Sequence, residues 1–354
     1  MKRIFMALVL LALALKPQAS IIDKISNSSL EVNEIATEEP YNGKIYHIFF
    51  HSLILYPELA FSGQRAKQYN DWMTTRKEFI AILDKLYNND FVLADIEEVR
   101  KAKVNGKPFM FPKDKKPLII SVDDVNYYDY MINDGFAEKL VIDDNGIVAN
   151  LVKTPQNNYV IDYQGDVMPI LNAFVEKYPD FSHNGAKGIV AVTGYQGVFG
   201  YRITSLIEGE LEQAKFQAME VATKLKQNGW QIACHSYSHS IKFKDGSISL
   251  ASFKSDIEKW QQHIAPIVGN TNIFIAPFGT QFATNSAQFD ILAQYGFDIY
   301  CSVCKNMKTS TYKGFLINER LNFDGFTMLK YPSRITESFF DLTGIVDPIR
   351  YLVV

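Results

Sequence analysis

Four side chains at the ends of two apolar runs have the types and spacing of a metal site with a base beside it. Asp123 and Asp124 directly follow one apolar run, and His235 follows another, with His239 four residues further on. Two imidazole nitrogens and one carboxylate suit zinc or a related divalent cation, and a second carboxylate next to them can accept a proton. These residue types predict a metal-dependent hydrolase.

The chain contains two His-x-x-x-His pairs, and their settings differ. His47 and His51 fall in an expected strand, where residues four apart stand roughly 13 Å apart at ~3.3 Å per residue. That distance is too long for one ion, so we expect His47 to be structural. His235 and His239 follow a strand instead, where a turn or helical start brings such side chains together. Positions 236 and 237 hold no glutamate, which excludes the His-Glu-x-x-His protease motif.

The elements that position these residues are expected to alternate between strands and helices. The expected strands are 46–55, 118–122, 188–193, 231–234 and 272–276, and the expected helices are 75–88, 167–178, 208–228 and 250–264. This alternation predicts a parallel sheet with helices outside it, in which strands buried on both faces need no polar alternation.

The candidate site residues come directly after the carboxyl ends of expected strands. Asp123 follows one strand, His235 a second, and Pro277-Phe278-Gly279 a third. Barrels and open parallel sheets bind their ligands at this edge. An aspartate pair alone is more typical of a turn or a helix cap, but three candidate segments at one edge favour a functional site.

The composition excludes several classes of protein. The chain has 354 residues, of which 47% are hydrophobic and 21% charged, so it can bury a large core and is neither disordered nor fibrous. Cleavage after Ala19 would remove three of the 36 basic residues and leave 33 against 39 acidic ones, and the resulting formal charge of about −6 argues against nucleic acid as a partner. The three cysteines, Cys234, Cys301 and Cys304, are too few for disulfides to be the main source of stability.

The first residues have the pattern of an export signal. Lys2 and Arg3 precede an apolar run over 4–15, and small residues follow near Ala19. The expected organisation is a signal peptide (1–19), a polar linker (20–40) and one domain (41–354). We therefore expect a secreted or cell-surface protein. The apolar run is too short for a dedicated transmembrane helix, so an uncleaved signal anchor is the only membrane contact that we expect.

The motifs resemble those of the polysaccharide deacetylases, the NodB-like carbohydrate esterase family 4. Residues 121–125, Ser-Val-Asp-Asp-Val, stand in place of the family's Thr-Phe-Asp-Asp-Gly, and residues 235–239 match its His-Ser/Thr-x-x-His. Residues 277–279 match the end of Arg-x-Pro-Tyr/Phe-Gly, with Ile275 at the arginine position. Order and strand context agree from residue 41 to about 330.

The resemblance implies a fold and a set of roles. The family fold is an α/β, distorted (β/α)7 barrel with parallel strands. Matched position by position, Asp124, His235 and His239 become the metal ligands, and Asp123 becomes the catalytic base. The backbone N–H of Phe278 would help to hold the oxyanion. The implied cofactor is a divalent metal ion, with zinc as the first candidate.

The sequence departs from the family in two motifs. Val125 replaces a glycine that lets the chain turn freely, which predicts a different local geometry. Ile275 removes the arginine that usually pairs with the base. Arg320 and Arg334 are candidate replacements by location alone, and a structural role is equally compatible with their positions.

The family's late histidine, which protonates the leaving group, is also missing. No histidine follows His263. His51 is expected at the mouth of the first strand and can supply a replacement proton donor. The alternative is an ordinary polar histidine at a strand end.

An insertion is expected at 126–164, between the first and second motifs. Asn145-Gly146 suits the tight turn of a hairpin. Tyr127, Tyr128 and Tyr130 follow the aspartate pair, and they fit two roles, a platform for sugar rings or packing of the insert.

These features favour an exported, metal-dependent deacetylase that removes acetyl groups from an N- or O-acetylated glycan, such as peptidoglycan or an amino-sugar exopolysaccharide. The acetylated glycan is the expected partner. One alternative is a hydrolase of non-peptide carbon–nitrogen bonds in another substrate. The other is a non-catalytic glycan-binding pseudoenzyme on the same fold, which the missing arginine and late histidine favour.

Overall fold

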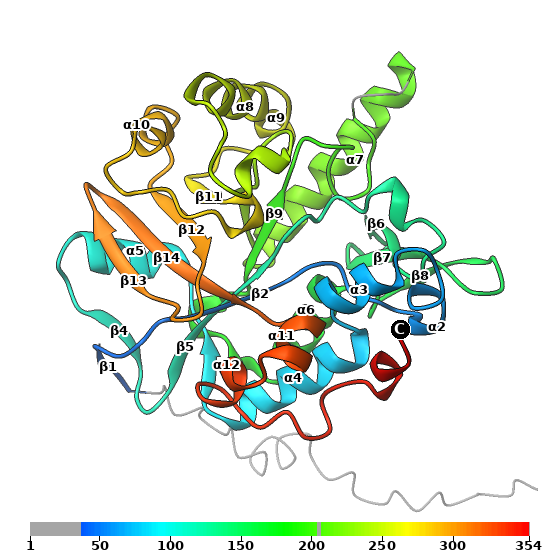
Figure 1. The fold of residues 1–354 in the computed structure, drawn as a ribbon, viewed down its shortest axis with the longest axis horizontal. Helices are drawn as coiled ribbons and strands as arrows, with labels where there is room; N and C mark the ends of the chain where they lie inside the picture. The colour runs from blue at the N-terminus through cyan, green and yellow to red at the C-terminus, as the bar shows by residue number, and fades with distance from the viewer. Residues whose placement is uncertain (1–36, 204–206, 354) are drawn as a thin grey trace, which may run out of the picture. The chain divides into compact units, whose positions relative to one another are not determined.

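Seven parallel strands close into a barrel in the computed structural model, which describes residues 37–203 and 207–353 (Figure 1). Each barrel strand pairs with the next, and the last pairs with the first. The barrel strands are β2 (Tyr46–Phe50), β5 (Lys116–Val122), β9 (Ile189–Val192), β10 (Gln231–Cys234), β11 (Ile273–Ile275), β12 (Ile299–Val303) and β14 (Phe315–Asn322). Helices surround them, so the predicted distorted (β/α)7 barrel is confirmed. The predicted signal peptide, 1–19, lies outside the described residues.

Additional strands distort the barrel. β3 (Phe91–Leu93) pairs with the start of β5, whereas β9 pairs with its end. β13 (Thr309–Tyr312) runs antiparallel to β14, and β1 (Glu38–Tyr41) pairs with β4 (Phe109–Pro112) in a separate two-stranded sheet.

The two faces of the barrel strands carry different side chains, because successive residues of a strand point to opposite faces. Leu118, Ile120 and Val122 of β5 belong to the large apolar core that the helices cover. Ile119 belongs to a second buried apolar cluster, together with Ile275 and residues of other barrel strands. Every residue of β5 from Leu118 to Val122 is therefore buried, as expected for a strand that is covered on both sides.

Amphipathic helices cover the barrel. α4 begins with a capping box in which Thr75 and Glu78 satisfy each other's backbone N–H, and it buries Phe79 and Leu83 against the sheet. The longer helices are α4 (Arg76–Asn88), α5 (Ile96–Val104), α6 (Val167–Lys177), α7 (Glu208–Gln227), α8 (Leu250–His263) and α10 (Ala287–Gln294). The shorter helices are α2 (Pro57–Ala60), α3 (Ala66–Trp72), α9 (Ala265–Val268), α11 (Gly325–Lys330) and α12 (Ser333–Thr336). Among the described residues, no helix is both long and apolar enough to cross a bilayer.

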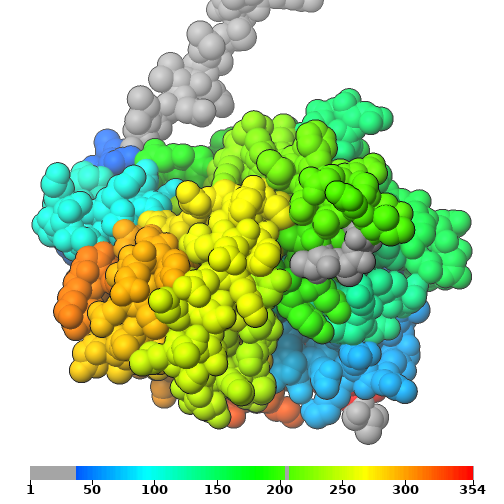
Figure 2. Space-filling model, turned by 90° about the horizontal axis from the view of Figure 1, so that it is seen from above, coloured from blue at the N-terminus to red at the C-terminus, as the bar shows by residue number. Residues whose placement is uncertain are grey.

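The segment between the first two motifs carries a sheet of its own. β6 (Ala137–Ile142), β7 (Val148–Lys153) and β8 (Tyr159–Asp162) form an antiparallel meander. Gly146 turns the first hairpin with a φ of 75°. The meander packs against α7, and Figure 2 shows the two side by side at the surface.

A buried ion pair ties the last described segment to the helices that follow β2. Arg350 donates through Nε to Oε1 of Glu78 at 2.6 Å and through Nη2 to Oε2 at 2.6 Å. It also donates to the carbonyl oxygens of Asn70 and Met73, each at 2.7 Å. Arg350 and Glu78 are both buried, so each charge depends on the other for compensation.

Candidate metal centre

The site residues predicted from sequence come from four strand ends, and they meet at the carboxyl end of the barrel. Asp123 and Asp124 follow β5, His235 and His239 follow β10, and the other two residues follow β2 and β11. All six line one cleft of about 440 Å³: His51, Asp123, Asp124, His235, His239 and Phe278. The strands position them because parallel strands end at the same rim.

Asp124, His235 and His239 form a group with the composition of a cation site. One ligand atom from each of the three lies within 4.8 Å of the other two. Nε2 of His239 is 3.7 Å from Oδ2 of Asp124, and the two imidazole rings are 5.1 Å apart between centroids. Two nitrogen donors and one oxygen donor suit a divalent cation and leave room for substrate or water as a further ligand.

His235 is held in the form that binds metals. Its Nδ1 lies 2.8 Å from the carbonyl oxygen of Ile275, which can only accept, so Nδ1 carries the proton and Nε2 offers a lone pair. Burial lowers the pKa of His235 against the opposing effect of Asp123 and Asp124, which favours the neutral imidazole.

A buried carboxylate on α8 holds the loop that carries the two histidines. Asp256 accepts hydrogen bonds from the backbone N–H of Tyr237 at 2.7 Å and of Ser238 at 2.9 Å. Within the loop, the N–H of His239 donates to Oγ of Ser236 at 2.9 Å. The sequence patterns above do not predict this role of Asp256. Its only sequence signal is an acidic residue at a buried position of α8.

Several residues of the site loops adopt the left-handed backbone conformation. Asp124 has a φ of 57°, Ser236 of 64°, His239 of 45° and Phe278 of 55°. Such residues are uncommon outside glycine and gather at functional sites. The backbone turn expected at the family's glycine position therefore occurs one residue earlier, at Asp124. Val125 needs no positive φ, and its side chain is fully buried.

Arg320 on β14 pairs with Asp123 inside the barrel. Its Nη1 donates to Oδ1 at 2.7 Å and its Nη2 to Oδ2 at 3.0 Å, in a two-pronged contact. Burial by itself would raise the pKa of Asp123, but the positive charge of Arg320 is the largest opposing effect, and the pKa falls to about 2. Of the two arginines considered from sequence, Arg320 therefore contacts Asp123, whereas Arg334 lies over the ring of Tyr331.

A chain of buried hydrogen bonds supports Arg320. Nη1 of Arg320 donates to Oγ of Ser121 at 2.9 Å, and that hydroxyl lies 2.9 Å from Nε2 of His47. The other ring nitrogen of His47 contacts Oδ1 of Asn318. Burial lowers the pKa of His47 to about 3, so its ring is neutral and can accept from Ser121. His47 thus lies below the cleft, in the barrel interior.

His51 and Phe278 border the cleft on two further sides. The side chain of Phe278 is 44% exposed, and its ring centroid lies 4.5 Å from that of His239. His51 lies near Phe49, with 5.9 Å between their ring centroids. Its positive charge would favour the ionised form of both Asp123 and Asp124.

The three tyrosines of the insert divide between packing and the cleft. Tyr127 is buried and donates to Asp166 at 2.6 Å. Tyr128 donates to Oδ1 of Asp124 at 2.5 Å and so orients a candidate metal ligand. Tyr130 is 39% exposed and lines the cleft.

The family model for polysaccharide deacetylase matches residues 198–300, which include β10, β11 and the loops that follow them. The resemblance to the polysaccharide deacetylases is confirmed. No curated protein matches the chain.

Solved structures are similar to this chain at low sequence identity. The Streptococcus pyogenes deacetylase PplD, in complex with acetate, is 14% identical with a TM-score of 0.51, and the match covers 84% of this chain and 98% of that one. The de-N-acetylase from Aggregatibacter actinomycetemcomitans is 14% identical with a TM-score of 0.49, over 80% and 96% of the two chains. IcaB from Ammonifex degensii is 12% identical with a TM-score of 0.45, over 81% and 95%.

Proposed function

We propose that this protein is a metal-dependent deacetylase that hydrolyses acetyl groups on an N- or O-acetylated glycan. The observation that carries the proposal is the arrangement of Asp124, His235 and His239 with Asp123 in one cleft, where Arg320 pairs with Asp123 from the barrel interior. Three ligands and a separate, ionised carboxylate are the parts that metal-assisted hydrolysis needs. We place the protein outside the cell or at its surface, because its first residues have the pattern of an export signal.

The donor set fits a divalent ion, with zinc as our first candidate. The neutral ring of His235 and the carboxylate of Asp124 offer lone pairs to one point, and His239 completes the set. When bound there, a divalent cation would polarise the acetyl carbonyl and lower the pKa of water toward ~7.

Asp123 is the proposed base. Its side chain is not one of the three proposed ligands, and its Oδ2 lies 4.0 Å from Nε2 of His235. Arg320 binds both of its oxygens, which keeps the carboxylate ionised and fixed in orientation while a lone pair remains to accept a proton from the attacking water.

Two further groups complete the proposed chemistry. The backbone N–H of Phe278 would donate to the oxyanion that forms when water adds to the acetyl carbon. His51 would donate a proton to the departing nitrogen or oxygen, because no other histidine among the described residues lines the cleft apart from the two proposed ligands.

The decisive experiment measures acetate release from a panel of acetylated glycans, with metal analysis of the same preparation. We expect one divalent ion per chain and acetate release by the natural protein. Asp123→Asn should keep the metal and lose at least about 100-fold in turnover. His235→Ala and His239→Ala should lose both metal and turnover, and stoichiometric metal in both variants would contradict the ligand assignment.

The proton donor has its own test. His51→Ala should lower turnover while the metal content stays intact. Unchanged kinetics in this variant would remove His51 from the mechanism.

A non-catalytic glycan-binding protein is the second candidate, favoured by the absence of any histidine after His263. Such a protein binds acetylated glycan and metal but releases no acetate. A hydrolase of other carbon–nitrogen bonds would instead release acetate, or another acid, from a small amide and leave every glycan of the panel intact.

A further inference from the structure

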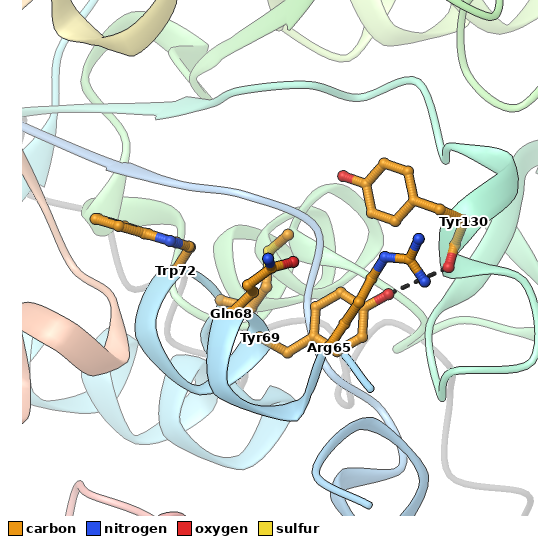
Figure 3. A pocket seen from close by; sticks show the side chains of 6 residues that line it. Arg65, Gln68, Tyr69, Trp72 and Tyr130 are labelled. Atoms are coloured by element: carbon orange, nitrogen blue, oxygen red, sulfur yellow. Dashed lines mark hydrogen bonds between the residues drawn. The ribbon is translucent and has the colours of Figure 1, made fainter. Parts of the chain in front are cut away.

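A second pocket of about 390 Å³ opens between α3 and the insert, and the proposed chemistry does not use it. It is lined by Arg65, Gln68, Tyr69, Trp72, Met73 and Tyr130. Figure 3 shows Trp72 and Tyr130 at its two sides, with Gln68 and Arg65 between them. The hydroxyl of Tyr69 donates to Oδ2 of Asp134 at 2.7 Å and lies 3.2 Å from the carbonyl oxygen of Tyr130, which ties the helix to the insert at the base of the pocket.

This pocket adjoins the metal cleft. Trp72, Met73 and Tyr130 line both of them. Tyr130 also stacks on Tyr128 with 5.5 Å between ring centroids, and Tyr128 donates to the carboxylate of Asp124. A ligand in this pocket therefore contacts residues that also line the metal cleft, as the next unit of a polymer would.

The aromatic walls have the form of sugar platforms. Trp72 is 49% exposed although it is large and apolar, and its ring packs against Phe326 with 5.5 Å between centroids. This contact holds the indole in one orientation and leaves the exposed part of the ring free to contact a ligand. Rigid aromatic rings bury much apolar area at a small entropic cost, and they pack well against the C–H faces of a pyranose.

Arg65 is the only charged side chain that lines this pocket. Its guanidinium lies over the ring of Tyr130, 5.2 Å from the centroid, and it forms no ion pair with any carboxylate in the described part of the chain. Lys67, two residues further along, pairs with Asp71 at 3.3 Å. An arginine held by an aromatic ring and free of an internal partner is suited to a planar anion such as a carboxylate.

We propose that this pocket is a second sugar subsite, which binds a carboxylate-bearing unit of the glycan next to the acetylated unit in the metal cleft. Trp72 would stack on the sugar ring, and Arg65 would pair with its carboxylate. The inference rests on the proposed function for the identity of the ligand as a glycan. It deepens that function by specifying an anionic polymer rather than a neutral one.

The test measures binding, so that it does not depend on turnover. Affinities of metal-loaded Asp123→Asn protein are compared for two acidic hexasaccharides and their carboxyl-reduced forms. One alternates N-acetylglucosamine with glucuronic acid, and the other alternates it with N-acetylmuramic acid, so the two acids distinguish a ring carboxylate from a lactyl ether carboxylate. We expect at least one acid to bind about fivefold more tightly than its reduced form.

Further substitutions in the Asp123→Asn protein distinguish binding in this pocket from a general effect of positive charge. Arg65→Gln should remove the preference for the acid, whereas Lys67→Gln, which deletes the same charge from the same helix, should retain it. Trp72→Ala should weaken the binding of the acid and of its reduced form by the same factor, on the order of tenfold. Equal affinities for both acids and their reduced forms, or equal effects of the two Gln variants, would overturn the proposal.

Acetate release by the unmodified protein is measured in parallel, so the two proposals fail separately. Charge-dependent binding without acetate release contradicts the deacetylase function and keeps the anionic subsite. Acetate release with no difference between acids and reduced forms contradicts the subsite and keeps the deacetylase function.

Discussion

Asp123 and Arg320 meet across the barrel although they lie far apart in the sequence. Both side chains are buried, and the guanidinium contacts both carboxylate oxygens. A buried carboxylate without a partner would take up a proton and lose its value as a base, because burial disfavours the charged form. Arg320 therefore supports both the fold and the proposed chemistry, and its removal should affect the two together.

Arg320→Ala should destabilise the protein by about 3 kcal/mol, because it leaves a buried charge uncompensated. It should also lower turnover, because the carboxylate loses its orientation and its negative charge. Arg320→Lys should retain more stability but not full turnover, since a lysine cannot bind both oxygens in one plane. Urea unfolding and acetate release measure the two effects. Full activity in Arg320→Ala would contradict the role given to the pair.

The residues that approach one another in the cleft were largely predictable from sequence, whereas the partner of the base was narrowed only to two candidates by location, Arg320 and Arg334. The six predicted residues follow strands of one parallel barrel, and strand order alone brings their positions together. Arg320 instead depends on the register between β14 and its neighbours β12 and β2. No local pattern encodes that register. The motif position normally held by arginine is Ile275, whose backbone carbonyl binds His235.

At the scale of elements, the loop after β10 depends on α8 for its shape. Asp256 accepts hydrogen bonds from two backbone N–H groups of the loop between His235 and His239. Outer contacts of this kind set the orientation of metal ligands.

Asp256→Ala should weaken metal affinity by about 10- to 100-fold, because the loop loses the anchor that positions His239. Asp290→Ala, which removes an exposed aspartate from α10, is the control and should leave the affinity unchanged. Competition with a chelator of known affinity measures both. Equal metal affinities in the two variants would show that the loop is positioned without Asp256.

The start of α6 should make stability depend on pH. Asp166 caps this helix and is fully buried, and burial raises its pKa to about 6. A carboxyl with a higher pKa in the folded state stabilises the fold below its unfolded pKa, and that stability is lost as the pH rises through the folded value. The loss amounts to about 3 kcal/mol.

Asp166→Asn cannot ionise, so the difference in unfolding free energy between the natural protein and this variant should change between about pH 4 and pH 7. The natural protein should lose stability relative to the variant as the pH rises. Urea titrations at several pH values provide the measurement, and parallel pH profiles would contradict the buried, proton-binding state of Asp166.

The sequence predicted the elements with strong periodicity and missed those without it. α4 and α8 were expected within one residue of their observed bounds, since both have an apolar stripe of helical period. β14 was missed because its inward residues, Asn318 and Arg320, are polar and break the apolar run expected of a buried strand. α3 was missed because it is short and polar, AKQYNDW, with few positions in the core.

At the scale of the whole molecule, Arg350 joins the last described segment to α3 and α4 through hydrogen bonds to Asn70 and Glu78. Arg350→Ala should cost about 3–5 kcal/mol of unfolding free energy, because Glu78 keeps its burial and loses its counter-charge. The double variant Arg350→Met with Glu78→Gln should recover much of that loss, since neither residue then carries a buried charge. Thermal and urea unfolding give the comparison, and an Arg350→Ala variant of natural stability would contradict the importance of this pair.

The closure of the barrel by β14 against β2 has a consequence for how the chain acquires its fold. β2 is made early, whereas β14 is made near the end of the described chain. Until then, one flank of β2 offers free backbone donors and acceptors to any other strand it meets. Pairings over such long sequence separations form slowly, and half-assembled sheets aggregate. Refolding from denaturant should therefore be slow, and its yield should fall as the protein concentration increases.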